Sequence, residues 1–240
     1  MPPTVSVVMP VYNESRTLRE IVARVLAAPF DKELVAVDDG STDGSGDILR
    51  ELASAHPDLS AEGSGDADVV RVVTLAKNSG KGAAVRAGFA KAKGDILVVQ
   101  DADLEYDPAD LPRLLAAMGR PGVDVVYGSR IMGHTPRGYA AFYVGGILVS
   151  LTASLLFRAH VSDEPTCYKM FRRTLLNTLP LECTGFEFCA EFTAKALRRG
   201  CVIPDVPIRY RARSLAEGKK ITWRDGVKAM ATLLRIALAR

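Results

Sequence analysis

Five runs rich in Val and Ile alternate with segments of helical periodicity over the first 130 residues. The runs occupy 5–10, 33–40, 69–75, 95–100 and 123–130, and the helical segments 15–28, 44–55, 80–92 and 108–118. Strands that alternate with helices in this way are typical of a mainly parallel sheet with helices on both faces. The sequence therefore predicts an α/β, Rossmann-like fold, with Ser15 as the N-cap of its first helix.

Each of the five apolar runs ends in polar residues. In chain order these ends read PVYNE, VDDGSTDGS, AKNSGKG, QDADLE and YGSR. In open α/β sheets, ligands bind just beyond the carboxyl ends of the strands. We therefore expect the five ends to share one edge of the sheet and to form one ligand site.

The fourth run is followed by an acidic cluster, QDADLEYDP at 100–108. In an extended turn Asp101 and Asp103 point the same way and Glu105 extends the row, because side chains alternate with a period of two. Carboxylates in such a row suit Mg²⁺ or Mn²⁺, which bridge to substrate phosphates. A helix start explains Asp107, which precedes a proline, but it leaves the other carboxylates unexplained. The cluster therefore predicts a metal site.

Two other strand ends carry polar turns. Asp38, Asp39 and Asp43 in DDGSTD are typical of ribose or base recognition, and equally of Asx turns and helix caps. The stretch NSGKG at 78–82 matches neither the P-loop nor the dinucleotide fingerprint. It still forms a glycine-rich entry to a helix, where Lys81 is suited to the approach of a phosphate or sugar.

These motifs, in this order, resemble the family 2 glycosyltransferases, which have the GT-A fold. Later stretches are similar to the branch that makes polyprenyl- or dolichyl-phosphate sugars, the group of dolichyl-phosphate mannose synthase: DEPTCYKMFRR, GFEFCAEFTAKALRRG and VPIRYRARSLAEGKKITWRDG. The resemblance runs from about Val5 to Gly226. It implies a metal-dependent, inverting hexosyltransferase that moves a sugar from GDP-mannose or a UDP-hexose to a polyprenyl phosphate.

The resemblance implies several roles on the donor side. Contacts to the base and ribose of the nucleotide fall on Pro10, Tyr12, Glu14 and Asp39. Asp101 and Asp103 match the DxD motif, with the metal on Asp103 and the donor diphosphate. Glu105, the third candidate metal ligand, stands where mannosyl-phosphate synthases often carry Gln. Lys220 aligns with a lysine near the donor diphosphate.

On the acceptor side, Arg130 of GSR matches the arginine that meets the acceptor phosphate, and Arg137 is a second candidate cation. A phosphate monoester has a second pKa of about 6, so the acceptor is largely a dianion at neutral pH and needs no general base. Asp163 then serves either as a base for a less acidic acceptor or as the group that orients an arginine. We prefer the second role.

Two other functions remain compatible with the sequence. One is sugar transfer on the same fold to a soluble acceptor, and the other is a non-catalytic nucleotide-sugar-binding module. The formal net charge of +3 gives no reason to expect nucleic acid as a partner. The chain is compatible with a membrane-protein partner and with a homo-oligomer.

Two segments suggest contact with a membrane surface. Residues 139–157 have no charged side chain and reach the length of a membrane span, but they are only weakly apolar, so we expect a buried or interface-lying helix. The stretch 223–240 has a basic amphipathic pattern, typical of helices on anionic membranes and also of ordinary packing helices. Four cysteines without disulfide or zinc spacing, and an N-terminus unlike a signal peptide, favour a cytoplasmic protein peripheral to the cytoplasmic face of the membrane.

The expected organisation is a catalytic domain over 1–210, followed by a basic loop and amphipathic helix over 211–240. Within the catalytic domain, the nucleotide-sugar half covers about 1–130 and the acceptor half about 131–210. The polar stretch at 56–68 is a loop inside the first half.

Overall fold

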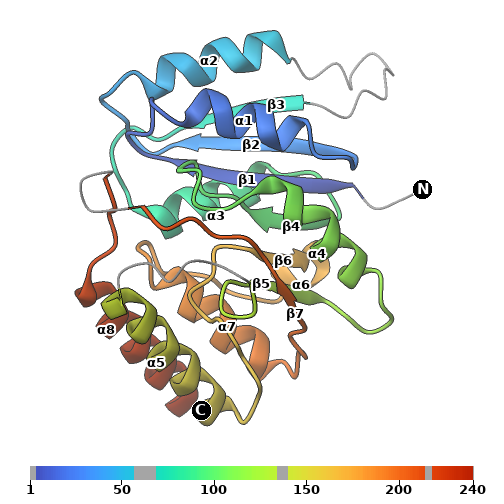
Figure 1. Cartoon of the computed structure of the whole chain (residues 1–240), viewed down its shortest axis with the longest axis vertical. Coiled ribbons are helices and arrows are strands. Elements are labelled where there is room, and N and C mark those ends of the chain that lie inside the picture. The colour runs from blue at the N-terminus through green and yellow to red at the C-terminus, as the bar shows by residue number, and fades with distance from the viewer. Residues whose placement is uncertain (1–3, 57–68, 134–139, 214–217, 240) are drawn as a thin grey trace.

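The structure is a computed structural model that describes residues 4–56, 69–133, 140–213 and 218–239. A seven-stranded sheet runs through it in the order β3-β2-β1-β4-β6-β5-β7 (Figure 1). The strands are β1 (Val5–Val11), β2 (Lys32–Asp38), β3 (Val69–Thr74), β4 (Ile96–Val99), β5 (Val125–Ser129), β6 (Lys169–Arg172) and β7 (Asp205–Pro207). The predicted loop at 56–68 lies, apart from His56, outside the described residues.

The first five strands run in one direction, which confirms the mainly parallel sheet. Strand β1 pairs in parallel with β2 and β4, and β2 pairs in parallel with β3. Strand β6 runs antiparallel between β4 and β5, so that β4 and β5 again point the same way, and β7 pairs in parallel with β5. The polar residues that follow the first five strands therefore gather at one edge of the sheet.

The helices are α1 (Leu18–Leu26), α2 (Ser45–Ala55), α3 (Lys81–Lys91), the 3₁₀ helix η2 (Pro108–Asp110), α4 (Leu111–Met118), α5 (Ala140–Phe157), α6 (Arg173–Leu176), α7 (Phe188–Arg198) and α8 (Trp223–Leu238). Those of the first 130 residues begin and end close to the predicted segments. The prediction for the first cap was wrong, because α1 begins after Thr17 and not after Ser15. The backbone N–H of Ser15 instead donates to the carboxylate of Asp43, so Ser15 belongs to the loop that precedes the helix.

Two apolar clusters hold these elements together. The larger one surrounds the sheet, and the smaller one joins α5, α7 and α8 through Val149, Ala153, Ala190, Ala194, Leu233 and Ile236. Helices α5 and α8 lie side by side at one corner of the molecule (Figure 1). In the part of the chain that the structure describes, no helix combines the length and the apolarity needed to cross a membrane.

Candidate functional site

One large cavity, of about 910 Å³, lies at the edge where the parallel strands end. Eleven residues predicted for the site line it: Pro10, Tyr12, Glu14, Asp39, Lys81, Asp101, Asp103, Glu105, Arg130, Asp163 and Lys220. The twelfth, Arg137, lies outside the described residues. Side chains that are up to 210 residues apart in sequence thus face one space.

The acidic cluster after β4 forms a turn, and the expectation of an extended row of carboxylates was wrong. Leu104 has a φ of +60°, and this left-handed residue turns the chain between Asp103 and Glu105. The Asp101 carboxylate lies 2.6 Å from the Lys81 ammonium, whereas Asp103 and Glu105 point to other partners. Among the described residues, no three His, Cys, Asp or Glu side chains converge into a metal cage.

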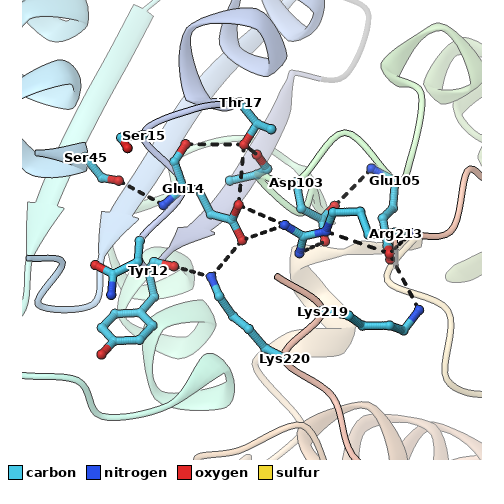
Figure 2. Close-up of polar contacts among 12 residues, drawn as sticks. Tyr12, Glu14, Ser15, Thr17, Ser45, Asp103, Glu105, Arg213, Lys219 and Lys220 are labelled. Atoms are coloured by element: carbon cyan, nitrogen blue, oxygen red, sulfur yellow. Dashed lines mark hydrogen bonds and ion pairs between the residues drawn. The ribbon is translucent and has the colours of Figure 1, made fainter. Parts of the chain in front are cut away.

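Arg213 lies at the centre of the acidic cluster, although the sequence alone does not single it out. Its guanidinium is 2.8 Å from the Asp103 carboxylate and 3.0 Å from that of Glu14, and its Nε is 3.8 Å from Glu105 (Figure 2). Glu105 also accepts hydrogen bonds from the backbone N–H of Arg213, at 2.6 Å, and from the Tyr210 hydroxyl, at 2.7 Å. Glu105 therefore anchors the segment that carries Arg213 over the cluster.

Two lysines that follow Arg213 in the chain, Lys219 and Lys220, add further positive charge beside the acidic cluster. The Lys220 ammonium is 2.7 Å from the Glu14 carboxylate and donates to the backbone carbonyl of Tyr12. The Lys219 ammonium is 3.6 Å from the Glu105 carboxylate. Figure 2 shows both lysines and Arg213 directed at carboxylates from other parts of the chain. Cations and carboxylates arranged in this way could exchange partners with a bound diphosphate and a metal ion.

The electrostatics of Asp103 are suited to a divalent ion. Burial, together with the neighbouring charges of Asp101 and Glu105, raises the pKa of Asp103 to about 7, although Arg213 opposes the rise. Mg²⁺ and Mn²⁺ at phosphate sites usually take one or two protein carboxylates and fill their remaining positions with water and phosphate oxygens. Asp101 and Asp103 are a carboxylate pair of that kind, so the residues present fit such an ion.

Asp39 shapes the turn that follows β3. Its carboxylate accepts hydrogen bonds from the backbone N–H groups of Ser79, at 2.7 Å, and Gly80, at 2.9 Å. Gly80 has a φ of +94°, and a Cβ there would lie 2.5 Å from the Thr184 carbonyl oxygen, so only glycine fits this turn. The turn places Lys81 at the start of α3, facing the cavity. Asp39 therefore has a structural role and also a place at the cavity wall.

The other two carboxylates of DDGSTD have local partners. Asp38 accepts a hydrogen bond from the Ser41 backbone N–H, at 2.9 Å. Asp43 accepts from the Ser15 N–H, at 2.9 Å, and from the N–H and hydroxyl of Ser45, at 3.0 and 2.6 Å. Burial alone would raise the pKa of Asp43, but these hydrogen bonds lower it to about 2. At Asp38 and Asp43, turn chemistry accounts for the described contacts.

Arg130, which is half-buried, and Asp163, which is buried, form a two-point ion pair. The Asp163 carboxylate accepts hydrogen bonds from Nε and Nη2 of Arg130, at 2.8 and 2.7 Å, and from its backbone N–H, at 2.8 Å. Burial would lower the pKa of Arg130, but the charge of Asp163 outweighs it and holds that pKa well above its usual value. The guanidinium also lies 5.0 Å from the centre of the Tyr210 ring. The Nη1 group has no described hydrogen-bond partner, which leaves one side of this fixed cation for a ligand.

The cavity continues as an apolar groove between α5 and α8. This part is lined by Tyr143, Gly145, Gly146, Leu148, Val149, Trp223, Val227 and Met230. Leu148, Trp223 and Val227 are also among the most exposed large apolar side chains of the described chain. The cavity therefore has a charged end at the sheet and an apolar end that reaches the surface.

Comparisons with known proteins agree with this geometry. Residues 6–179 match the sequence profile described as "Glycosyl transferase family 2". The chain belongs to glycosyl transferase family 2. This confirms the family that the ordered strand-end motifs resembled.

Two curated relatives are similar along most of the chain. It is 33% identical over 224 residues to the polyprenol monophosphomannose synthase of Mycolicibacterium smegmatis. That alignment covers 89% of this chain and 79% of the synthase. It is 32% identical over 219 residues to an undecaprenyl-phosphate 4-deoxy-4-formamido-L-arabinose transferase of Pseudomonas fluorescens, and that alignment covers 90% of this chain. The chain spans only 59% of that transferase's length.

A solved structure supports the same fold. Glucosyl-3-phosphoglycerate synthase from Mycobacterium tuberculosis, in complex with Mn²⁺, UDP and glucosyl-3-phosphoglycerate, superposes with a TM-score of 0.72 at 24% identity. The match covers 98% of this chain and 80% of that one. The mainly parallel sheet flanked by helices is thus the GT-A fold, as predicted.

Proposed function

We propose that the chain is a metal-dependent glycosyltransferase that moves a hexose from a nucleoside diphosphate sugar to the phosphate of a polyprenyl lipid. The observation that carries this proposal is the form of the cavity, which is charged at the sheet edge and apolar between α5 and α8. A polyprenyl phosphate has the same two parts, a dianionic head and a hydrocarbon tail. Both curated relatives described above are named as polyprenyl-phosphate sugar enzymes, which supports the assignment.

The donor belongs at the carboxylate end of the cavity. Four wall residues would contact the base and ribose: Pro10, Tyr12, Glu14 and Asp39. Asp101 and Asp103 would hold Mg²⁺ or Mn²⁺ against the diphosphate. Such an ion, when bound, supplies Lewis-acid stabilisation of the departing nucleoside diphosphate. Lys220 and Arg213, which now pair with carboxylates, would add positive charge to the same diphosphate.

The acceptor phosphate belongs beside Arg130. Asp163 fixes the Nε–Nη2 side of that guanidinium, so the phosphate would meet its Nη1 side. One phosphate oxygen then attacks the anomeric carbon of the donor sugar. The bond from that carbon to the diphosphate oxygen breaks, and its electron pair leaves with the nucleoside diphosphate. A single displacement of this kind inverts the anomeric configuration, and the dianionic phosphate needs no general base.

A lipid acceptor also implies a place for the protein in the cell. The exposed groove side chains Leu148, Trp223 and Val227 would meet the hydrocarbon of a bilayer while the charged end stays in water. We therefore place the protein at a membrane surface, on the cytoplasmic face, as a peripheral protein.

The test is transfer from radiolabelled GDP-mannose and UDP-glucose, with Mn²⁺, to two acceptors: a short-chain polyprenyl phosphate in detergent and 3-phosphoglycerate in water. We expect product with the lipid, from one donor, and none with the soluble phosphate. Asp103→Asn should lower the rate by at least about 100-fold, because it removes one carboxylate from the proposed ion. Asp124→Asn, the same change at an exposed carboxylate outside the cavity, should leave the rate unchanged.

Each part of the proposal can fail separately in this assay. Product with 3-phosphoglycerate alone would replace the lipid acceptor by a soluble one. Equal rates with and without a metal chelator would remove the metal from the mechanism. The absence of transfer, with nucleotide binding still measurable by calorimetry, would make the chain a binding module.

A further inference from the structure

Helix α8 presents two different stripes to the solvent. An apolar stripe consists of four residues that are spaced by four, seven and four positions: Trp223, Val227, Leu234 and Leu238. These side chains are between 44% and 79% exposed. A basic stripe lies one residue later, with spacings of four and seven residues, and is also exposed: Arg224, Lys228 and Arg235. Because residues at these spacings share one side of a helix, the two stripes run next to each other along α8.

Helix α5 adds a second apolar stripe beside the first. Its members are spaced by four, three and four residues and are at least half exposed: Val144, Leu148, Leu151 and Leu155. Helix α5 packs against α8, and Leu148 lines the large cavity together with Trp223 and Val227, so the two stripes meet at that cavity. We call the two stripes and their basic border the α5–α8 face. Scattered apolar side chains are normal on a protein surface, but two stripes that meet on neighbouring helices indicate an interaction surface.

The basic border leads into a second cavity. This groove, of about 480 Å³, lies where α7 and α8 end, and the loop from Thr178 to Glu182 closes it. Its charged lining residues are Glu182, Lys195, Arg198, Arg199 and Arg235. We call it the arginine groove. It shares no lining residue with the large cavity at the sheet edge.

Three guanidinium groups in the arginine groove have no carboxylate partner among the described residues. Arg198 donates to the backbone carbonyl of Ile236 at 2.8 Å, and Arg199 to that of Thr178 at 2.7 Å. Arg235 makes only a long contact, of 3.9 Å, with the Cys183 sulfur. Neutral carbonyls hold the first two side chains in place without cancelling their charge.

The two acidic side chains nearby offset only part of this charge. Lys195 is already paired with the buried carboxylate of Glu191, at 2.7 Å. Glu182 is exposed and makes no described ion pair. The arginine groove therefore keeps a positive charge of about two, from three arginines against one carboxylate, and this charge is suited to a phosphate group.

The geometry points to the arginine groove as a binding site for the phosphate of an anionic phospholipid headgroup, occupied when the α5–α8 face lies on a bilayer. This inference rests on the membrane location that the proposed function assigns. Arg235 belongs to both the basic stripe and the arginine groove, and exposed Leu238 follows it by one helical turn. A phosphate bound there is thus next to apolar surface, which favours a lipid headgroup over a soluble phosphate.

The test compares binding of the full chain to phosphatidylcholine vesicles with and without 30% phosphatidylglycerol, by co-sedimentation. Each basic residue near an anionic surface contributes a factor of about five, so Arg199→Gln with Arg235→Gln should weaken binding to the anionic vesicles about 25-fold. Arg113→Gln with Arg120→Gln removes the same charge from exposed positions in α4 and just after it, outside both cavities, and should weaken binding less than threefold. Transfer to the short-chain acceptor in detergent should not change in either double variant.

Three outcomes would overturn the inference. Equal losses in the two double variants would mean that net charge alone drives the binding. Equal binding of the native chain to neutral and anionic vesicles would remove the headgroup from the interaction. Displacement of the chain from vesicles by millimolar inorganic phosphate at constant ionic strength would mean a site for free phosphate. Failure of the proposed function would appear separately, as absence of transfer by the native chain in detergent.

Discussion

At the scale of single residues, the contacts of Asp163 favour a role in orienting Arg130 over a role as a general base. The Asp163 carboxylate accepts three hydrogen bonds, all from Arg130, and the side chain is 1% exposed. Asp163→Asn should leave the arginine in place but poorly oriented, since an amide has one acceptor oxygen in place of two. We expect kcat/KM for the acceptor to fall about 100-fold, mainly through a higher KM.

The pH profile separates this positioning role from that of a general base. If Asp163 only orients Arg130, the rates of the native chain and of the Asp163→Asn variant should both follow the ionisation of the acceptor phosphate. If the fall of the rate at low pH disappeared in the variant, Asp163 would instead be the general base that takes the proton of the acceptor. Asp124→Asn is the matched control and should behave as the native chain.

Asp43 ties the loop before α1 to the start of α2, and its hydrogen bonds make stability depend on pH. Its pKa is about 2 in the folded chain, below its ordinary value, so its contribution is present above about pH 4 and is lost as the pH falls through 2. Because Asp43 is exposed, solvent screens part of this effect. Asp43→Asn should therefore lower the free energy of unfolding by about 1 kcal/mol at pH 7.

Urea unfolding at pH 7 and at pH 2.5 checks the sign of this effect. The difference between Asp43→Asn and the native chain should shrink at the lower pH. A difference that stays constant with pH would mean that the lost hydrogen-bond geometry, and not the charge, is responsible. Asp47→Asn changes another exposed carboxylate of the same turn region and should show a smaller effect at pH 7.

Single residues also show where sequence reasoning stops. Asp101 and Asp103 could be predicted as a pair because they follow a buried strand and have no local partner in the sequence. Arg213 could not, because its carboxylate partners are 110 and 199 residues away and meet it only through the tertiary fold. The alternation of Arg209, Arg211 and Arg213 in RYRAR was the available signal, since it indicates an extended chain with basic side chains on one side.

At the scale of elements, the strands and helices of the first half could be predicted because each has a clean apolar pattern and a polar end. Strand β6 could not, because Lys169–Arg172 is a four-residue strand that contains two basic residues. It is a strand because it pairs on both sides, with β4 and with β5. Its Lys169 is buried and held by the Glu164 carbonyl and the Thr193 hydroxyl, a compensation that the sequence does not reveal.

Helix α5 illustrates a second limit. Its sequence is apolar on all sides, so periodicity cannot tell which face is buried. The structure buries Val149 and Ala153 against α8 and leaves Leu151 and Leu155 exposed. Which face remains exposed is decided by the packing partner, and that partner lies 70 to 90 residues further along the chain.

At the scale of the whole molecule, the ends of the parallel strands and the segment that carries Arg213 bring the charged residues of the site to one edge, and α5 and α8 add an apolar surface beside it. The large cavity joins the two, because it is lined both by the carboxylates after β4 and by exposed side chains of α5 and α8. This continuity is a property of the assembled fold. The sequence predicted the charged edge from strand ends and the amphipathic pattern of 223–240, but it predicted neither the shared cavity nor the exposed stripe of α5.

The α5–α8 face gives the last prediction. Leu151 and Leu155 are exposed and do not line the large cavity, so their replacement tests the surface without altering the site. Leu151→Gln with Leu155→Gln should weaken vesicle binding at least tenfold, because each substitution removes about 1 kcal/mol of the free energy gained by burying the side chain in the bilayer. The same double substitution should change the free energy of unfolding by no more than about 0.5 kcal/mol.

Val202→Gln, at another exposed apolar side chain, which precedes β7, is the control. Because none of the three replaced side chains lines the large cavity, transfer to a short-chain acceptor in detergent should persist in all variants, while transfer to polyprenyl phosphate in vesicles should fall with vesicle binding. Vesicle binding unchanged by the leucine substitutions, or equally reduced by Val202→Gln, would mean that the protein meets the membrane by another surface.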